Sequence, residues 1–335
     1  MGVDGSGVDG SGLGDIGIGI IGLGAIGACH ARAIRTVGGR VVAVAGPKPA
    51  ENAEFAAEHG IARAYAETAA LLDDDAVSAV VVAAPSPVHA SLTIAALRAG
   101  KHVLCEIPVG VSLAEAESVA RTAEETGRIA ASAHTLRFWA PMLEVRSRVE
   151  RGELRLRHVI ARSLQLRQSD VGWTGKVRDW TDSVLWHHGA HLVDTALWLL
   201  DASEADAHGR CGPSWAGNGR PMDVGALLAT PGGGLATISL SYHSRKAVSD
   251  YVLIAEDQTL HIEDGRLFGS DKVIVDSPGT AATQDAAIEA QDADFLAAVA
   301  EGRVPRCTAA DVLPAMRVLE ALEIASPNEK CDPPT

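Results

Sequence analysis

The letters IGIGIIGLGAIG, residues 16–27, contain two overlapping copies of the pattern GxGxxG and constrain this chain more than any other stretch. A dinucleotide-binding fingerprint needs a strand before it and a helix after it. Only the second copy meets this condition, because an apolar run over 16–21 precedes it and a helical pattern over 25–37 follows it. We therefore predict that a pyrophosphate binds to bare backbone amides at a helix N-terminus; the alternative is a purely structural glycine turn. The residues of this predicted cradle are Gly22, Gly24, Ala25, Ile26 and Gly27.

Short apolar runs alternate with helix-length segments through the first part of the chain. Nearly continuous apolar strands between helices are typical of a doubly wound parallel sheet, which is buried on both faces. We predict a dinucleotide-binding Rossmann domain over residues 15–135. Its clearest predicted strands are 16–21, 41–45, 79–84 and 102–106.

After about residue 152 the pattern changes to β-branched stretches separated by turn signals. It predicts an open, mostly antiparallel sheet with a helix over 183–200 on one face, so the whole chain is α/β. This second domain, for substrate binding and oligomerisation, is placed at 136–325, and its closing helices are expected to return to the first domain. The glycine-rich start, 1–14, predicts a disordered extension, and 326–335 a loose tail.

Composition excludes several classes of function. The net charge of −14 argues against nucleic-acid binding through a general basic surface, and no apolar run has the length of a membrane span. The five cysteines are scattered and odd in number, without a disulfide framework or a CxxC metal site. These features, with no signal-peptide pattern, indicate a reduced, cytoplasmic protein.

The end of the second predicted strand bears on the choice of cofactor. NAD enzymes usually carry a carboxylate there that binds the adenosine ribose. This chain reads AVAGPKPAE, with Gly46 at that point and no acid before Glu51. Lys48 is placed to attract a 2′-phosphate, which favours NADP. If Lys48 is only a solvated loop residue, NAD is also accepted.

Polar residues and prolines follow two later strands, in APSPVHA and CEIPVG. The carboxyl ends of such strands form the ligand crevice. We therefore expect Pro85, His89, Glu106 and Pro108 to line the nicotinamide half of the cofactor. For His89 the alternative is that it caps the helix that follows.

The motifs GLGAIG, APSPVHA, EIP and GAHLVD, in this order, resemble the Gfo/Idh/MocA oxidoreductases. The resemblance implies a Rossmann domain, a second α/β domain with an open sheet, oxidation or reduction at a CH–OH group with NAD(P), and a homodimer or homotetramer. This family usually reads EKP, with a lysine that polarises the substrate. Here Ile107 replaces it, so other groups must move the proton. Cys105 as a nucleophile is the less favoured reading, because a buried cysteine at a strand end is more often packing.

A narrower resemblance rests on EIP, HTLRF, RDWTDSVLWHHGAHLVD and QDADFLAAVAEGR. These stretches are similar to a branch of the family that uses NADP to oxidise the cyclic hemiacetal of a carboxylated semialdehyde in the bacterial breakdown of aromatic acids. The resemblance implies a small anionic substrate. Two alternatives stay open: a sugar or inositol-type dehydrogenase or ketoreductase, and a regulatory protein that binds NADP without catalysis.

The run WHHGAHLVD offers three interpretations. At about 100° per residue, His187, His191 and Asp194 share one helix stripe. A zinc site from His187 and His191 lacks the glutamate of HExxH, so no metal is expected. Alternatively, one or more of these histidines is simply hydrogen-bonded in the core. We favour acid/base catalysis by His191, because the unperturbed pKa of histidine is about 6.5. Asp194 would orient this imidazole or raise its basicity, and His188 would assist it.

Gly189, inside this predicted helix, costs about 1 kcal/mol relative to alanine. Its presence predicts that a cofactor or substrate approaches the backbone closely. For substrate carboxylates the planar guanidinium of arginine is the best partner. Among Arg137, Arg167, Lys176 and Arg178 we favour Arg137 and Arg178. His187 is assigned to the substrate side as well.

Overall fold

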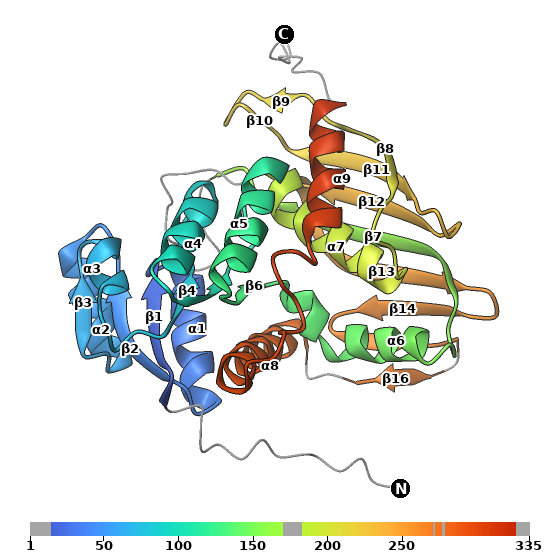
Figure 1. Ribbon diagram of the computed structural model, residues 1–335. Coiled ribbons are helices and arrows are strands. Elements are labelled where there is room, and N and C mark those ends of the chain that lie inside the picture. The colour runs from blue at the N-terminus through green and yellow to red at the C-terminus, as the bar shows by residue number, and fades with distance from the viewer. Residues whose placement is uncertain (1–14, 170–182, 271, 277–278, 326–335) are drawn as a thin grey trace, which may run out of the picture.

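Two separate sheets organise the chain, with helices packed on and between them (Figure 1). The computed structural model describes residues 15–169, 183–270, 272–276 and 279–325. The predicted disordered extension, 1–14, and loose tail, 326–335, lie outside these ranges. No helix in the described ranges is both long enough and apolar enough to cross a membrane.

The first sheet is parallel and has the strand order β3-β2-β1-β4-β5-β6, as the Rossmann prediction requires. The prediction identified β1, β2, β4 and β5 but not β3 and β6, which are only three residues long and lack an apolar run. The elements of this half are β1 (Gly17–Ile21), α1 (Ala25–Thr36), β2 (Arg40–Ala45), α2 (Pro49–His59), β3 (Arg63–Tyr65), α3 (Thr68–Leu72), β4 (Ala79–Val82), the 3₁₀ turn Ser86–Val88, α4 (His89–Arg98), β5 (His102–Cys105), α5 (Leu113–Thr126), β6 (Ala130–Ser132), the 3₁₀ turn Thr135–Phe138 and α6 (Ala140–Glu150).

The second sheet has the order β16-β15-β14-β13-β7-β12-β11-β8 and is antiparallel except where β7 meets β12. The predicted open, mostly antiparallel sheet is therefore confirmed. Its elements are β7 (Leu156–Leu166), a π-helical turn (Leu185–Gly189), α7 (Ala190–Leu199), β8 (Asp206–Cys211), β11 (Asp223–Ala229), β12 (Leu235–Ser241), β13 (His243–Ala255), β14 (Thr259–Glu263), β15 (Arg266–Phe268), β16 (Val273–Val275), α8 (Thr280–Glu301) and α9 (Leu313–Ile324), with the small ribbon of β9 (Ser214–Trp215) and β10 (Arg220–Pro221) beside it.

The closing helices connect the two halves. Helix α9 packs on α7 and also contacts α5 of the first half, while α8 lies beside α1 (Figure 1). Side chains of α1, early in the chain, and of α8, late in the chain, therefore meet beside the first sheet.

The predicted helix over 183–200 is not uniform. Its first part is the π-helical turn, in which the amide of Gly189 donates to the carbonyl oxygen of Val184, five residues back, at 3.1 Å. The wider turn changes the direction of the side chains before it relative to those after it. The prediction that His187 shares one stripe with His191 and Asp194 at α-helical spacing is therefore wrong in detail.

The explanation of Gly189 by a nearby ligand is also wrong. A Cβ atom on Gly189 would lie 3.2 Å from Leu319 and 3.3 Å from Leu240. Apolar side chains of α9 and β12 thus fill the space beside Gly189, and an alanine there would require them to shift by a few tenths of an ångström. Core packing therefore accounts for a small residue at this position.

Candidate active site

The turn between β1 and α1 has the geometry of a phosphate cradle. Gly22 adopts a φ of 99°, and a Cβ there would lie 2.4 Å from the carbonyl oxygen of Ala83. A Cβ on Gly27 would lie 2.3 Å from the oxygen of Gly22, so only glycine lets α1 approach β1 this closely. Both glycines are therefore required by the backbone, whatever binds.

Gly24 differs from these two glycines. A Cβ on Gly24 would meet no described atom within 4 Å, so the space above this residue is open. Gly24 is the N-cap of α1, and no side chain caps it within the described residues. The amides of the first turn, which includes Ala25 and Ile26, are thus available to an anion, and the residues present fit a dinucleotide pyrophosphate.

At the end of β2 an amide side chain stands near the position usually taken by a carboxylate. A Cβ on Gly46 would lie 2.7 Å from Oδ1 of Asn52, whose Nδ2 donates to the carbonyl oxygens of Gly46 and Tyr65 at 2.6 and 2.8 Å. This packing excludes an acidic residue at Gly46. Lys48 is exposed and forms an ion pair with Glu51 at 3.0 Å.

His89 links the loops that follow β4 and β5. Its Nδ1 and Nε2 lie 2.8 and 2.6 Å from the carbonyl oxygens of Pro108 and Ala84. The ring is buried and makes no cap hydrogen bond with α4, so the capping alternative for His89 is wrong. Pro85 leads into the 3₁₀ turn, and the bond before Pro108 is cis. His89 thus positions the two loops that carry Pro85 and Pro108.

Glu106 belongs to a buried cluster that sequence reasoning missed. Its Oε1 lies 2.9 Å from Nε2 of His30, and Nδ1 of that ring lies 2.9 and 3.0 Å from the two carboxylate oxygens of Asp292. The available signal was the position of His30, three residues after Gly27, on a helix face that must pack on the sheet. Its partner on α8 is 262 residues away, and no local pattern indicates such a pair.

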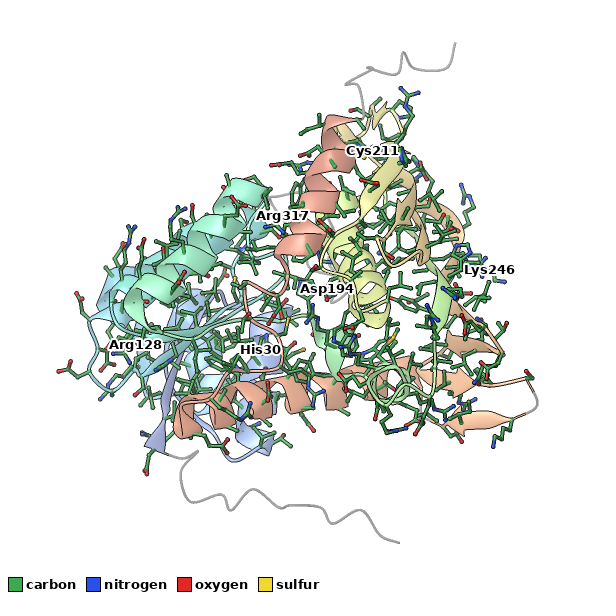
Figure 2. The ribbon with its side chains drawn as sticks, turned by 45° about the vertical axis from the view of Figure 1, so that its right-hand side comes forward. His30, Arg128, Asp194, Cys211, Lys246 and Arg317 are labelled. Atoms are coloured by element: carbon green, nitrogen blue, oxygen red, sulfur yellow. The ribbon has the colours of Figure 1, made fainter. Side chains whose placement is uncertain are left out.

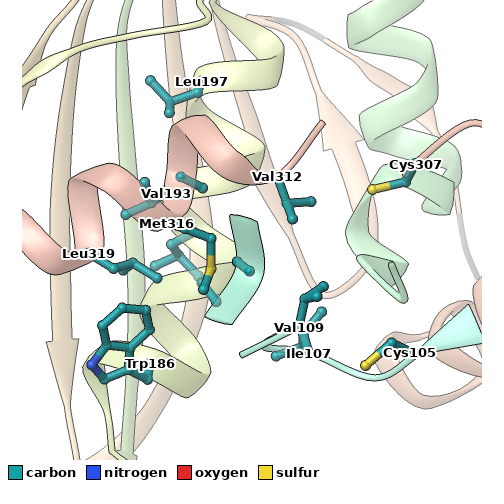
Figure 3. Close-up of a cluster of buried hydrophobic side chains, with 14 of the residues drawn as sticks. Cys105, Ile107, Val109, Trp186, Val193, Leu197, Cys307, Val312, Met316 and Leu319 are labelled. Atoms are coloured by element: carbon teal, nitrogen blue, oxygen red, sulfur yellow. The ribbon is translucent and has the colours of Figure 1, made fainter. Parts of the chain in front are cut away.

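Ile107, which stands where the resembling family has lysine, is part of the apolar core. It is 4% exposed and lies in one cluster with Val109, Val193 and Met316 (Figure 3). Cys105 is buried as well, and burial raises the pKa of its thiol to about 12. A nucleophilic Cys105 is therefore incompatible with this environment, and the packing interpretation holds.

His191, at the start of α7, is half-buried, and its Nδ1 has no hydrogen-bond partner in the described part of the chain. Burial and the neighbouring His134 lower the pKa of this imidazole, although Glu106 and Asp194 act in the opposite sense. Asp194 thus acts to raise the pKa of His191, as predicted, but burial and His134 outweigh it, and the net pKa lies below its ordinary value. Near neutral pH the ring is uncharged and can accept a proton.

Asp194 is engaged elsewhere. Its carboxylate accepts two hydrogen bonds from Arg137, at 2.8 and 2.7 Å, and lies 3.2 Å from Nδ1 of His134. Burial opposes ionisation, but His134 and Arg137 outweigh it and hold the pKa of Asp194 well below its usual range. Asp194 thus positions Arg137 and His134, and no hydrogen bond joins it to His191 among the described contacts. Arg137 is correspondingly occupied, which argues against its predicted role in binding a substrate carboxylate.

His188 is held by β7. Its Nδ1 and Nε2 lie 2.9 Å from Oγ of Ser163 and 2.8 Å from the side-chain amide of Gln165. Its ring stands edge-on to Tyr242 at a centroid distance of 5.5 Å, and burial lowers its pKa. This matches the alternative of a hydrogen-bonded histidine better than a free base.

His187 lies between the other two rings, with centroid distances of 4.8 Å to His188 and 6.2 Å to His191. The structure thus brings the three histidines together. The substrate candidates Lys176 and Arg178 fall outside the described residues. Among those residues, no three acidic, histidine or cysteine side chains converge on a point where a metal ion would sit.

Arg167, a candidate that sequence reasoning did not favour, reaches the same group. Its Nη1 donates to the hydroxyl of Tyr242 at 3.2 Å, and its guanidinium lies 5.3 Å from the centre of that ring. Its positive charge also lowers the pKa of His188. A cation therefore stands beside the histidines, on the sheet side.

Comparison with known proteins places this geometry in a family. Residues 16–134 match the model of the oxidoreductase family with an NAD-binding Rossmann fold (Gfo/Idh/MocA), and residues 142–276 match that of the bacterial oxidoreductase C-terminal domain. The chain belongs to the Gfo/Idh/MocA family. It is an oxidoreductase that acts on a CH–OH group with a nicotinamide cofactor.

The chain is similar to several named proteins. Over 299 residues, 88% of this chain and 94% of the relative, it is 32% identical to 4-carboxy-2-hydroxymuconate-6-semialdehyde dehydrogenase from Sphingobium sp.. It is 32% identical over 178 residues, 52% of this chain and 53% of the relative, to 1,5-anhydro-D-fructose reductase from Ensifer adhaerens. An oxidoreductase domain protein from Kribbella flavida shares the fold, with a TM-score of 0.81 at 23% identity over 93% of this chain and 97% of that one.

Proposed function

We propose that this protein oxidises the hydroxyl carbon of a cyclic hemiacetal that carries carboxylates, and that NADP is its preferred acceptor. The proposed substrate is 4-carboxy-2-hydroxymuconate-6-semialdehyde, oxidised to 2-pyrone-4,6-dicarboxylate in the degradation of aromatic acids. The similarity to the Sphingobium dehydrogenase over nearly the whole chain supports this choice. The stretches EIP and LWHHGAHLVD support the same choice.

The observation that carries the proposal is the state of His191. This imidazole is uncharged near neutral pH, its Nδ1 lacks a partner in the described structure, and it is close enough to Glu106 for that charge to act on it. Ile107 excludes an ammonium group from the usual position. His191 is thus the group that remains to accept the hydroxyl proton.

The other residues bind and orient. The first turn of α1 and the loops that carry Pro85 and Pro108 would hold the cofactor, with Lys48 at its adenosine end. The nicotinamide ring supplies the acceptor for the hydride when it is bound. His191 takes the proton of the lactol hydroxyl. Asp194 fixes His134, whose ring centre lies 6.0 Å from that of His191. His188 is held by Ser163 and Gln165 of β7 and so forms part of the pocket on the side of the second sheet.

In this proposal Arg167 contributes to recognition of the anionic substrate, because its guanidinium is half-buried and lies beside Tyr242 and His188. The guanidinium of Arg137 is held by Asp194. Arg178 and His187 stay proposed substrate contacts. We propose a homodimer or homotetramer in the cytoplasm.

A sugar or inositol-type dehydrogenase is the second candidate. The partial match to 1,5-anhydro-D-fructose reductase favours it, and so does the row of neutral polar groups on β7 that suits hydroxyls. A regulatory protein that binds NADP without catalysis is the third.

An assay at 340 nm separates the three. Purified protein is incubated with NADP and, in separate reactions, the semialdehyde, myo-inositol or glucose. A further reaction contains NADPH and 1,5-anhydro-D-fructose. Turnover of the semialdehyde alone is expected. Broad turnover of polyols or sugars contradicts the substrate, and cofactor binding without any turnover contradicts the enzyme.

The same assay tests His191. His191→Asn should lower kcat by about a hundredfold or more with an unchanged melting temperature, because the base is lost. His188→Asn is the matched comparison and should lower kcat by less than about tenfold. Equal losses in the two variants would remove His191 from its proposed role.

A further inference from the structure

His30 is a fully buried imidazole held by two carboxylates. It lies on α1 with 0% exposure, where Figure 2 labels it. Its contacts of 2.9 to 3.0 Å reach Asp292 on α8 and Glu106 after β5. Three segments that are distant in sequence thus converge on one ring. The proposed catalytic chemistry does not use this cluster.

The charge of the cluster follows from its hydrogen bonds. A neutral imidazole donates from one nitrogen only, whereas both nitrogens of His30 face carboxylate oxygens. Burial alone would lower the pKa of His30, but the charges of Asp292 and Glu106 outweigh it and raise the pKa to about 10. One imidazolium between two carboxylates leaves one net negative charge.

Only one member of the cluster reaches the crevice. The side chain of Glu106 is 14% exposed, whereas those of His30 and Asp292 are 0% and 1% exposed. Glu106 directly follows β5, and the carboxyl ends of such strands line the cofactor crevice. Its second oxygen accepts a hydrogen bond from the amide of Ile107 at 3.2 Å. Two donors therefore fix the carboxylate at the mouth of the crevice.

We propose that His30 and Asp292 are positioning residues that keep Glu106 ionised and fixed beside the nicotinamide site, so that its charge favours oxidised over reduced cofactor. The oxidised ring carries a positive charge and the reduced ring is neutral, so a nearby carboxylate stabilises only the oxidised form. This inference rests on the NAD(P)-binding fold of the family and does not depend on the proposed substrate.

The direct test measures cofactor binding without substrate. Dissociation constants for NADP⁺ and NADPH are determined by fluorescence titration for the wild type and for Glu106→Gln, which keeps the shape and removes the charge. The ratio of the NADP⁺ to the NADPH constant should rise about tenfold, as expected for a unit charge near the ring. Equal changes in both constants, or none, would overturn the proposal.

Asp250→Asn is the matched control. Asp250 is 4% exposed and paired with Arg162 and His261, but it lies on β13 in the second sheet. Removing this buried carboxylate should leave the ratio unchanged. A shift as large as that of Glu106→Gln would show that the ratio does not report on the crevice, and the proposal would fall.

The positioning role has its own readout. His30→Gln with Asp292→Asn replaces the imidazolium and one of its two carboxylates by amides, so the net charge of the cluster is unchanged and Glu106 alone carries it. The charges of His89 and His191 still act on Glu106 in this variant. Since its ionisation is no longer enforced, the ratio of constants should vary between pH 6 and pH 9, where that of the wild type is flat. A flat, wild-type ratio in this double variant would rule out His30 and Asp292 as positioning residues.

Discussion

The two sides of the active site are built in different ways. On the nucleotide side, the turn from Gly22 to Gly27 presents backbone amides, and every requirement is local: one positive φ, one close approach and one open position. On the proposed substrate side, His191 and its surroundings depend on side chains from several segments that are distant in the sequence. The first kind of site can be identified from a short stretch of sequence, whereas the second depends on which distant partners the fold supplies.

The largest expected effect tests the side-chain network. Asp194→Asn breaks the buried pair with Arg137 and should cost about 3–5 kcal/mol of unfolding free energy. The folded-state pKa of Asp194 lies below its ordinary value of 3.8, so its contribution is present above that pH and is lost as the pH falls further. Denaturant unfolding of the wild type and of Asp194→Asn at pH 7 and pH 3 measures the stability loss and its dependence on pH.

Asp201→Asn is the comparison for that variant. Asp201 also pairs with an arginine, Arg146, but its side chain is 72% exposed. Its loss should change stability by less than about 1 kcal/mol. If the two variants are equally mild, the buried network is not what holds the substrate side together.

An intermediate effect separates two glycines within the nucleotide side. Gly22→Ala should destabilise the fold by about 3 kcal/mol, because the new Cβ meets the oxygen of Ala83 in a strained conformation. Gly24→Ala should change stability by less than about 1 kcal/mol and instead weaken cofactor binding, since its Cβ enters the open space. Unfolding curves and cofactor titrations on both variants check this. Identical behaviour of the two would show that the turn is structural only.

The smallest expected effect concerns the adenosine end of the cofactor. Lys48→Ala should reduce the preference for NADP over NAD by about tenfold, about 1.4 kcal/mol, through loss of one charge at the 2′-phosphate. Glu51→Ala, which removes the partner of Lys48, should leave or increase that preference. Dissociation constants for both cofactors give the answer, and an unchanged ratio in Lys48→Ala would count against NADP.

The same contrast explains what the sequence predicted. The apolar run before Gly22 and the helical pattern after it were enough to predict the start of the first sheet, because strand, turn and helix are consecutive in the sequence. The role of Arg137 was not predictable in this way, since its partner Asp194 lies 57 residues further along. His30 shows the limit most clearly, because its polar ring lies on a packed helix face and is explained by two distant carboxylates, Glu106 and Asp292. Local patterns identified candidate residues, but the fold decided their partners.

The π-helical turn before α7 has a consequence for how such a pocket changes over evolutionary time. The hydrogen bond from the amide of Gly189 to the carbonyl oxygen of Val184 spans one residue more than the hydrogen bond of an α-helix. Deletion of a single residue would restore the tighter winding and swing His187 and His188 by about 100°, while the packing of α7 stayed in register. Insertions and deletions at this point would therefore reorient the histidines of the pocket together with Leu185 and Trp186, which are buried in the same turn, so a change of this kind requires the adjoining core to repack.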